Sequence, residues 1–152
     1  MPPSGLSFPR AGNAAGWTAG MAGPPRTRRV LVVEDDVAIR MALTEALQDE
    51  GFDVATAANG RQALDRLRGG PLPSAIVLDL MMPVMDGWDF RHAQLQDPKL
   101  RQIPVVVVTA AGFSTDTVKL QFGDVALVPK PVEFLDLVSA LESACDRTPP
   151  KS

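Results

Sequence analysis

The chain has 152 residues, of which 45% are hydrophobic and 22% charged, and this length and composition favour one packed domain of ordinary size. The only cysteine, Cys145, excludes an internal disulfide framework and indicates a reducing compartment. Residues 1–29 hold four arginines and no acid, so the remainder, with 11 basic and 18 acidic residues, has a net charge of −7. An acidic body argues against nucleic-acid binding as the main role, and no apolar run approaches the ~20 residues that span a bilayer.

The N-terminal stretch differs in composition from the rest of the chain. Residues 1–28 contain five prolines and five glycines without a hydrophobic period, which predicts a disordered tail. This stretch lacks the apolar segment of a signal peptide, so we expect a cytoplasmic protein in which Met21, rather than Met1, is a possible start of translation. Residues 147–152 are predicted to form a short C-terminal tail.

The first structural elements are expected from Val30 onward. The apolar run VLVV (residues 30–33) predicts a buried strand, and three consecutive acids follow it: Glu34, Asp35 and Asp36. Asp36 is the expected cap of the next helix. That helix should bury one face, made of Ile39, Leu43, Ala46 and Leu47, and should end before Gly51.

The middle of the chain repeats this alternation. DVATA (residues 53–57) predicts a weaker strand, and Asn59 is a plausible cap for a helix that ends at Gly69-Gly70. The apolar positions of that helix are Ala63, Leu64 and Leu67. AIVLDL (residues 75–80) predicts a third strand, and a third helix should start near Asp86.

The last third of the chain adds two more strand–helix pairs. IPVVVVT (residues 103–109) and VALVP (residues 125–129) predict strands, with a short helix between them capped by Ser114 or Thr115. The final helix should bury a face made of Phe134, Val138, Leu141 and Cys145. Continuous apolar runs are typical of strands covered on both faces, so five βα repeats predict an α/β fold with a doubly wound, five-stranded parallel sheet.

Polar side chains come directly after the predicted strands. The three acids follow the first strand, Asp79 ends the third, Thr109 ends the fourth and Lys130 follows the fifth. The carboxyl ends of parallel strands share one edge of the sheet, where such folds bind ligands. Several carboxylates beside a hydroxyl and an ammonium suit Mg²⁺ and a phosphoryl group, for which an aspartate is a competent nucleophile.

The motifs EDD, VLDLMMPVMDG, VVVVTA and VPKP, in this order, resemble those of a response-regulator receiver domain. The resemblance covers residues 29–146 and implies the flavodoxin-like receiver fold with strand order 2-1-3-4-5. It implies a stand-alone module of two-component signalling, which catalyses only its own phosphorylation and dephosphorylation.

The resemblance also implies roles for individual residues. Asp79 corresponds to the phosphoacceptor. Asp35 would bind Mg²⁺ directly and Glu34 through water, with the Met81 backbone carbonyl as a further ligand. Thr109 would donate a hydrogen bond to a phosphoryl oxygen, and Ala110 beside it is small enough to admit the group. Lys130 would pair with the phosphoryl group. The Lys130–Pro131 peptide bond is expected to be cis.

A departure from the family pattern at Leu127 and the chemistry shared with another family leave two alternatives. Leu127 stands where many members carry an aromatic that moves on phosphorylation, so a constitutive binding module is an alternative. A phosphatase of the haloacid-dehalogenase type would need a second aspartate at Met81. The resemblance also implies that Met81 and Ala111 flank the approach of the water that attacks the phosphoryl group. Neither side chain hydrogen-bonds water strongly, so we expect slow self-dephosphorylation.

The expected partners are a histidine kinase or phosphotransfer protein and an unknown downstream protein, with no nucleic acid and no membrane. The downstream protein should bind the face made by the fourth helix, fifth strand and fifth helix. We expect His92 to be a solvated helical residue rather than a phosphodonor. The three loop methionines, Met81, Met82 and Met85, should serve packing, and Cys145 should lie in the core or at its margin.

Overall fold

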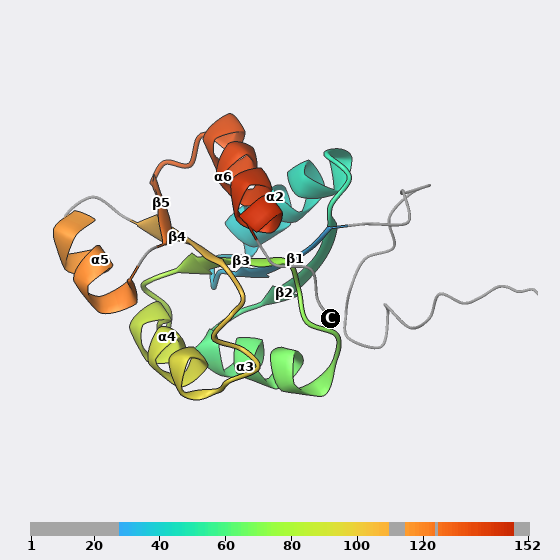
Figure 1. Cartoon of the computed structure of the whole chain (residues 1–152). Coiled ribbons are helices and arrows are strands. Elements are labelled where there is room, and N and C mark those ends of the chain that lie inside the picture. The colour runs from blue at the N-terminus through green and yellow to red at the C-terminus, as the bar shows by residue number, and fades with distance from the viewer. Residues whose placement is uncertain (1–27, 110–114, 124, 148–152) are drawn as a thin grey trace, which may run out of the picture.

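Five strands and five helices alternate along the described part of the chain (Figure 1). The structure is a computed structural model that describes residues 28–109, 115–123 and 125–147. The strands are β1 (Arg29–Val33), β2 (Asp53–Ala57), β3 (Ala75–Asp79), β4 (Val105–Thr109) and β5 (Ala126–Pro129). The helices are α2 (Val37–Asp49), α3 (Gly60–Gly69), α4 (Gly87–Gln96), α5 (Thr115–Phe122) and α6 (Phe134–Arg147). The predicted fivefold βα repeat is confirmed.

The strands form one parallel sheet in the order β2-β1-β3-β4-β5, as the resemblance implied. Every residue of β3 is buried, and so are the last four of β1, which explains their unbroken apolar sequences. The fourth predicted strand, residues 103–109, begins only at Val105 in the structure. Pro104, which has no N–H to donate, directly precedes the strand.

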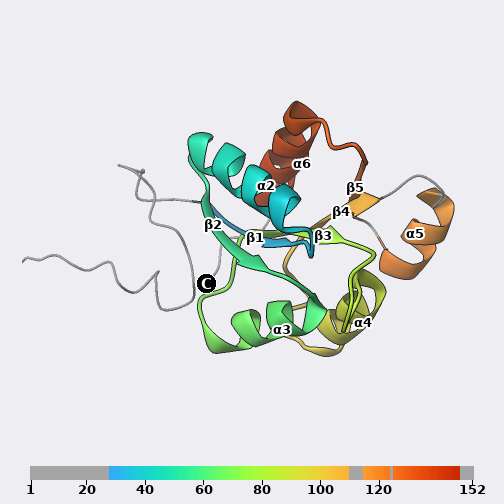
Figure 2. The ribbon, with the colours of Figure 1, turned by 180° about the vertical axis from the view of Figure 1, so that it is seen from behind.

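Helices cover both faces of the sheet, as Figures 1 and 2 show from opposite sides. Side chains alternate along β1: Leu31 and Val33 belong to a core cluster with residues of α3, α4 and α5, whereas Val30 and Val32 belong to one with residues of α2 and α6. The two clusters are the two halves of the core of a doubly wound sheet.

Side-chain caps start three of the helices where the sequence predicted. Asp36 accepts a hydrogen bond from the N–H of Ile39, Asn59 from that of Gln62, and Asp86 from that of Asp89. The predicted cap of α5 lies outside the described residues, because Ser114 and the side chain of Thr115 are not among them. The last helix buries Val138 and Leu141 and packs Phe134 and Cys145 at the margin, as predicted.

The predicted apolar face of the first helix is wrong at its N-terminal end. Leu47 is buried and Leu43 is partly buried against the core, but Ile39 is 37% exposed. Asp36 caps α2 immediately beyond the carboxyl end of β1, so the first turn of α2 projects past the strands that would cover Ile39.

The domain limits predicted from the sequence stay a prediction. Of the two expected tails, residues 1–28 and 147–152, only Arg28 and the backbone of Arg147 belong to the described residues. Within the described residues, none of the helices is long and apolar enough to cross a bilayer.

Candidate functional site

The β1–α2 loop, residues 34–36, holds its three acids by its own hydrogen bonds. Glu34 is buried, and its Oε2 accepts from the backbone N–H of Asp36 at 3.1 Å. Arg40 donates from Nη1 to the carbonyl of Glu34 at 2.8 Å and to that of Asp35 at 3.4 Å. Asp35 is exposed and Asp36 caps α2, as predicted. The loop therefore presents one buried and one exposed carboxylate in fixed positions.

Asp79 lies at the carboxyl end of the central strand β3 and is only 4% exposed. Its Oδ1 accepts from the Lys130 Nζ at 3.3 Å and from the backbone N–H of Met81 at 3.4 Å. Residues 80–86 form the β3–α4 loop, which begins directly after it. These contacts fix one carboxylate oxygen of Asp79 and point the side chain toward the acids that follow β1.

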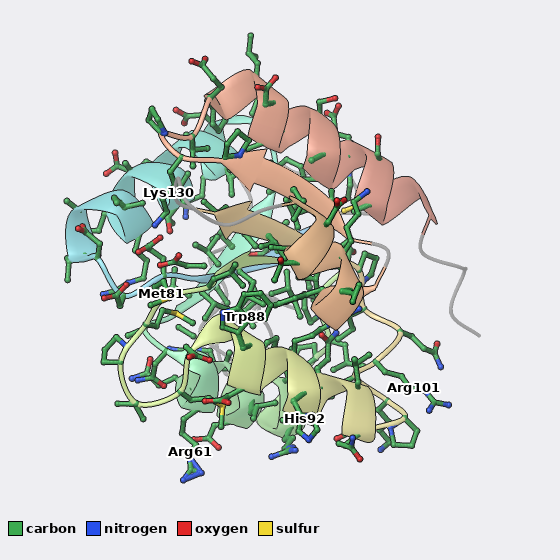
Figure 3. All side chains as sticks on the ribbon, turned by 90° about the vertical axis from the view of Figure 1, so that its left-hand side faces the viewer. Arg61, Met81, Trp88, His92, Arg101 and Lys130 are labelled. Carbon is green, nitrogen blue, oxygen red and sulfur yellow. The ribbon has the colours of Figure 1, made fainter. Side chains whose placement is uncertain are left out.

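Lys130 follows β5 and supplies the positive charge of the site. Its Nζ lies 3.3 Å from Asp79 Oδ1 and 3.9 Å from Glu34 Oε1, and the Lys130–Pro131 bond is cis, as predicted. Figure 3 shows Met81 and Lys130 on the same side of the molecule, opposite Arg101. One ammonium thus bridges two buried carboxylates, that of Glu34 directly after β1 and that of Asp79 at the end of β3.

The electrostatics of the site are dominated by the buried Glu34. The pKa of the Glu34 carboxyl is raised from 4.5 to about 7, chiefly because burial removes the charged form from water. The charges of Asp79 and Asp35 contribute to this rise, whereas the hydrogen bond from the Asp36 N–H and the charge of Lys130 oppose it. Among the described residues, three carboxylates are grouped here with the single ammonium of Lys130, and a divalent cation would offset the remaining negative charge.

The three carboxylates fit such a cation. Glu34, Asp35 and Asp79 each offer an oxygen, and these oxygens lie within 4.8 Å of one another. Mg²⁺ prefers one or two carboxylates together with several waters, and the exposure of Asp35 leaves one side of the group open to solvent. The chemistry and spacing of this donor set suit magnesium.

The structure brings together Glu34, Asp35, Asp79 and Lys130, and it places the backbone of a fifth predicted residue beside them. Thr109 ends β4 and pairs with Pro129, while the preceding Val108 pairs with Asp79. The Thr109 side chain lies outside the described residues, as do Ala110 and Ala111. The role of Thr109 and the Met81 carbonyl as a metal ligand stay predictions.

The side chains of the other singled-out residues do not join the group of acids. His92 is exposed on α4 (Figure 3), which agrees with a solvated helical residue. Met82 and Met85 pack against the core, as predicted, but the predicted packing of Met81 is wrong, because its side chain is 57% exposed. Leu127 is partly buried against the core cluster of α3, α4 and α5.

One contributor was missed from the sequence. Arg40 holds the carbonyls of the acidic loop, but an arginine on the first turns of a helix carries no signal that distinguishes it from a solvated surface residue. The hydrogen bonds of Arg40 become apparent only in the folded structure, where the carbonyls of Glu34 and Asp35 lie within reach of its side chain.

Known proteins with similar sequences show the family to which the chain belongs. A family model described as the response regulator receiver domain matches residues 30–142. The response regulator MprA of Mycolicibacterium vanbaalenii is 37% identical over 123 residues, which cover 80% of this chain and 52% of that protein. Response regulator Rre1 of Synechocystis is 35% identical over 106 residues, covering 68% of this chain and 46% of that protein. The chain thus spans about half the length of these curated relatives.

Solved structures give the same result for the fold. The signal receiver domain of a signal transduction histidine kinase from Syntrophus aciditrophicus superposes with a TM-score of 0.75 at 28% identity, covering 83% of this chain and 96% of that one. The receiver domain of a sensor histidine kinase from Pseudomonas aeruginosa, with a magnesium ion coordinated in its active site cleft, has a TM-score of 0.72 at 25% identity. It covers 79% of this chain and 98% of that one.

Proposed function

This chain belongs to the response regulator receiver domain family of two-component signalling, and from that premise we propose that Asp79 accepts a phosphoryl group from a histidine kinase or a phosphotransfer protein. The observation that carries the proposal is the position of Asp79. It is a buried carboxylate at the end of the central strand, held by Lys130 at 3.3 Å and grouped with Glu34 and Asp35.

The proposed reaction is a phosphoryl transfer onto a carboxylate. An oxygen of Asp79 forms a new bond to phosphorus while the bond from phosphorus to the donor imidazole nitrogen breaks, leaving an acyl phosphate on the protein. Lys130 and Thr109 pair with the phosphoryl oxygens. Asp35, Asp79 and the Met81 carbonyl, with Glu34 acting through water, would hold Mg²⁺, which would supply positive charge where negative charge accumulates.

Two alternatives predict different behaviour. A haloacid-dehalogenase-type phosphatase would turn over phosphate esters, but the position for its second aspartate holds Met81, which is exposed and has no proton to exchange. A constitutive binding module would keep the fold without being phosphorylated. Leu127 in the place of the mobile aromatic keeps this second alternative open.

We further propose that this receiver acts in the cytoplasm through protein contacts rather than by binding nucleic acid. The predicted output face consists of α5, β5 and α6. Both helices of this face carry an exposed leucine, Leu120 on α5 (81%) and Leu135 on α6 (78%), whose apolar side chain a partner would bury.

The test is labelling with acetyl phosphate, read on a phosphate-affinity gel with and without Mg²⁺. The wild type should be labelled only with Mg²⁺, and Asp79→Asn should stay folded and unlabelled. Asp89→Asn, at an exposed acid of α4, is the matched control and should label like the wild type. A folded wild type that stays unlabelled would favour the constitutive module, and release of free phosphate from a phosphate ester would favour the phosphatase.

A further inference from the structure

The β3–α4 loop touches α3 at a contact that leaves no room for a side chain. The backbone N–H of Gly60, the first residue of α3, donates to the carbonyl of Met85 at 2.8 Å. A Cβ on Gly60 would lie 2.7 Å from Met85 Cγ, 2.9 Å from its Sδ and 2.9 Å from its carbonyl oxygen. The sulfur end of Met85 could turn aside, but its carbonyl could move only with the loop.

The other end of the same loop is fixed in a similar way. The N–H of Gly87 donates to the carbonyl of Leu80 at 2.9 Å, and a Cβ on Gly87 would lie 2.6 Å from the Asp79 carbonyl oxygen. The loop is therefore closed on itself at its base by Gly87 and attached to the neighbouring helix by Gly60. Figure 2 shows α3 and α4 side by side beneath the sheet, with this loop running between β3 and α4.

The backbone between these two attachments is strained. Val84 has a φ of 69°, a conformation that is unfavourable for a β-branched residue, and its side chain is 81% exposed. Without packing of its own side chain, Val84 keeps this conformation because the segments on either side hold it. The contact of Met85 with Gly60 is one of these restraints.

We propose that Gly60 is a positioning residue for the magnesium site: by admitting the Met85 carbonyl, it fixes the loop that carries the Met81 carbonyl relative to Asp79. The inference rests on the proposed function, in which that carbonyl is a magnesium ligand. Gly60 itself touches neither the metal nor the phosphoryl group. A small displacement of the loop weakens magnesium binding because Mg²⁺ requires nearly ideal geometry from its ligands.

The experiment compares Gly60→Ala with Gly69→Ala in the same helix. A Cβ on Gly69 would meet nothing within 4 Å, so that substitution tests the general effect of alanine in α3. Magnesium affinity is measured by titration calorimetry and by the rise of the melting temperature with Mg²⁺ concentration. Gly60→Ala should bind Mg²⁺ about tenfold more weakly, as changes to groups that support metal ligands do. Gly69→Ala should bind like the wild type.

The double variant Gly60→Ala/Met85→Ala separates loop position from side-chain crowding. It removes the Met85 Cγ and Sδ but leaves its carbonyl against the new methyl group, so the weak magnesium binding should persist. Wild-type affinity in Gly60→Ala, or recovery of it in the double variant, would overturn the inference. If neither Gly60→Ala nor the double variant folds, the inference is also overturned, because Gly60 is then required for the stability of the fold.

The same experiment distinguishes this inference from the proposed function. If neither the wild type nor Gly69→Ala responds to Mg²⁺, the magnesium site itself is wrong and the inference fails with it. If the wild type responds and Gly60→Ala responds equally, only the positioning role is wrong.

Discussion

The β1–α2 loop and the β3–α4 loop meet at the same edge of the sheet but are built on different principles. In the first, side chains carry the structure: Glu34 accepts from the N–H of Asp36, Asp36 caps α2, and Arg40 holds two carbonyls. The second loop is held in place by backbone hydrogen bonds, from the N–H of Gly60 to the carbonyl of Met85 and from the N–H of Gly87 to the carbonyl of Leu80. The first loop supplies charge, and the second supplies a fixed backbone.

This difference determines which amino-acid substitutions each loop tolerates. A loop held by side chains loses its function when those side chains are removed, because their charge and hydrogen bonds are the function. A loop held by close backbone approach loses its function when atoms are added, because the approach depends on the missing Cβ. Substitutions in the two loops should therefore separate charge effects from geometric ones.

The largest expected effect belongs to the charge of the first loop. In the magnesium-free protein, the folded state holds the Glu34 proton with a pKa of about 7, against 4.5 ordinarily. The resulting stabilisation is present below about pH 4.5 and is lost as the pH rises through about 7, by at most about 3 kcal/mol. Urea unfolding between pH 5.5 and 8 should show stability falling with pH. Glu34→Gln should flatten this dependence, and an equal slope in both proteins would contradict it.

The next effect concerns the exposed acid of the same loop. Asp35→Ala should weaken magnesium binding at least about tenfold, because a direct ligand matters more than the groups that support ligands. Asp36→Ala is the matched control: it should cost about 1 kcal/mol of stability through the lost helix cap but keep the magnesium response. Equal melting shifts with Mg²⁺ in the wild type and Asp35→Ala would count against the assigned site.

A smaller effect is expected in the second loop, at the side chain that faces solvent. Met81 is 57% exposed and cannot hold a water for attack on the phosphoryl group. Met81→Asn adds an amide that can orient that water, and one added hydrogen bond of about 1 kcal/mol should speed self-dephosphorylation several-fold, up to about tenfold. Decay of the phosphorylated proteins is compared in one magnesium buffer. Equal or slower decay in the mutant would show that water positioning at Met81 does not limit the lifetime.

The smallest effect tests the strain of the second loop. Val84→Gly should stabilise the protein by about 0.5–1 kcal/mol, since relief of the positive φ outweighs the entropy that glycine adds to the unfolded chain. Val84→Ala keeps a Cβ and should gain less. Urea midpoints of the three proteins give the order, and a glycine variant less stable than the wild type would show that the conformation costs little.

The same contrast explains what the sequence could predict. The strand order came from the resemblance, while the strands, the caps at Asp36 and Asn59 and the acids of the first loop follow from residue type, because apolar runs, caps and charges are local signals. The grouping of Asp79 with Lys130 follows from the shared edge of parallel strands.

The contacts of the second loop did not follow, for a physical reason. The contact of Gly60 with Met85 depends on how the start of α3 and the β3–α4 loop approach one another in space, and neither residue type predicts it. The exposure of Ile39 was missed for a similar reason: helical periodicity shows which residues share a face but not how much of that face the sheet covers.

The most direct test of the central claim locates the phosphoryl group on the wild-type chain. After reaction with acetyl phosphate and Mg²⁺, borohydride converts a phosphorylated aspartate to homoserine, which mass spectrometry finds in tryptic peptides. Cleavage after Arg68 and Arg91 gives one peptide that contains Asp79, Asp86 and Asp89. The account predicts homoserine at position 79 alone. Homoserine at either of the other two positions, or in another peptide, would contradict it.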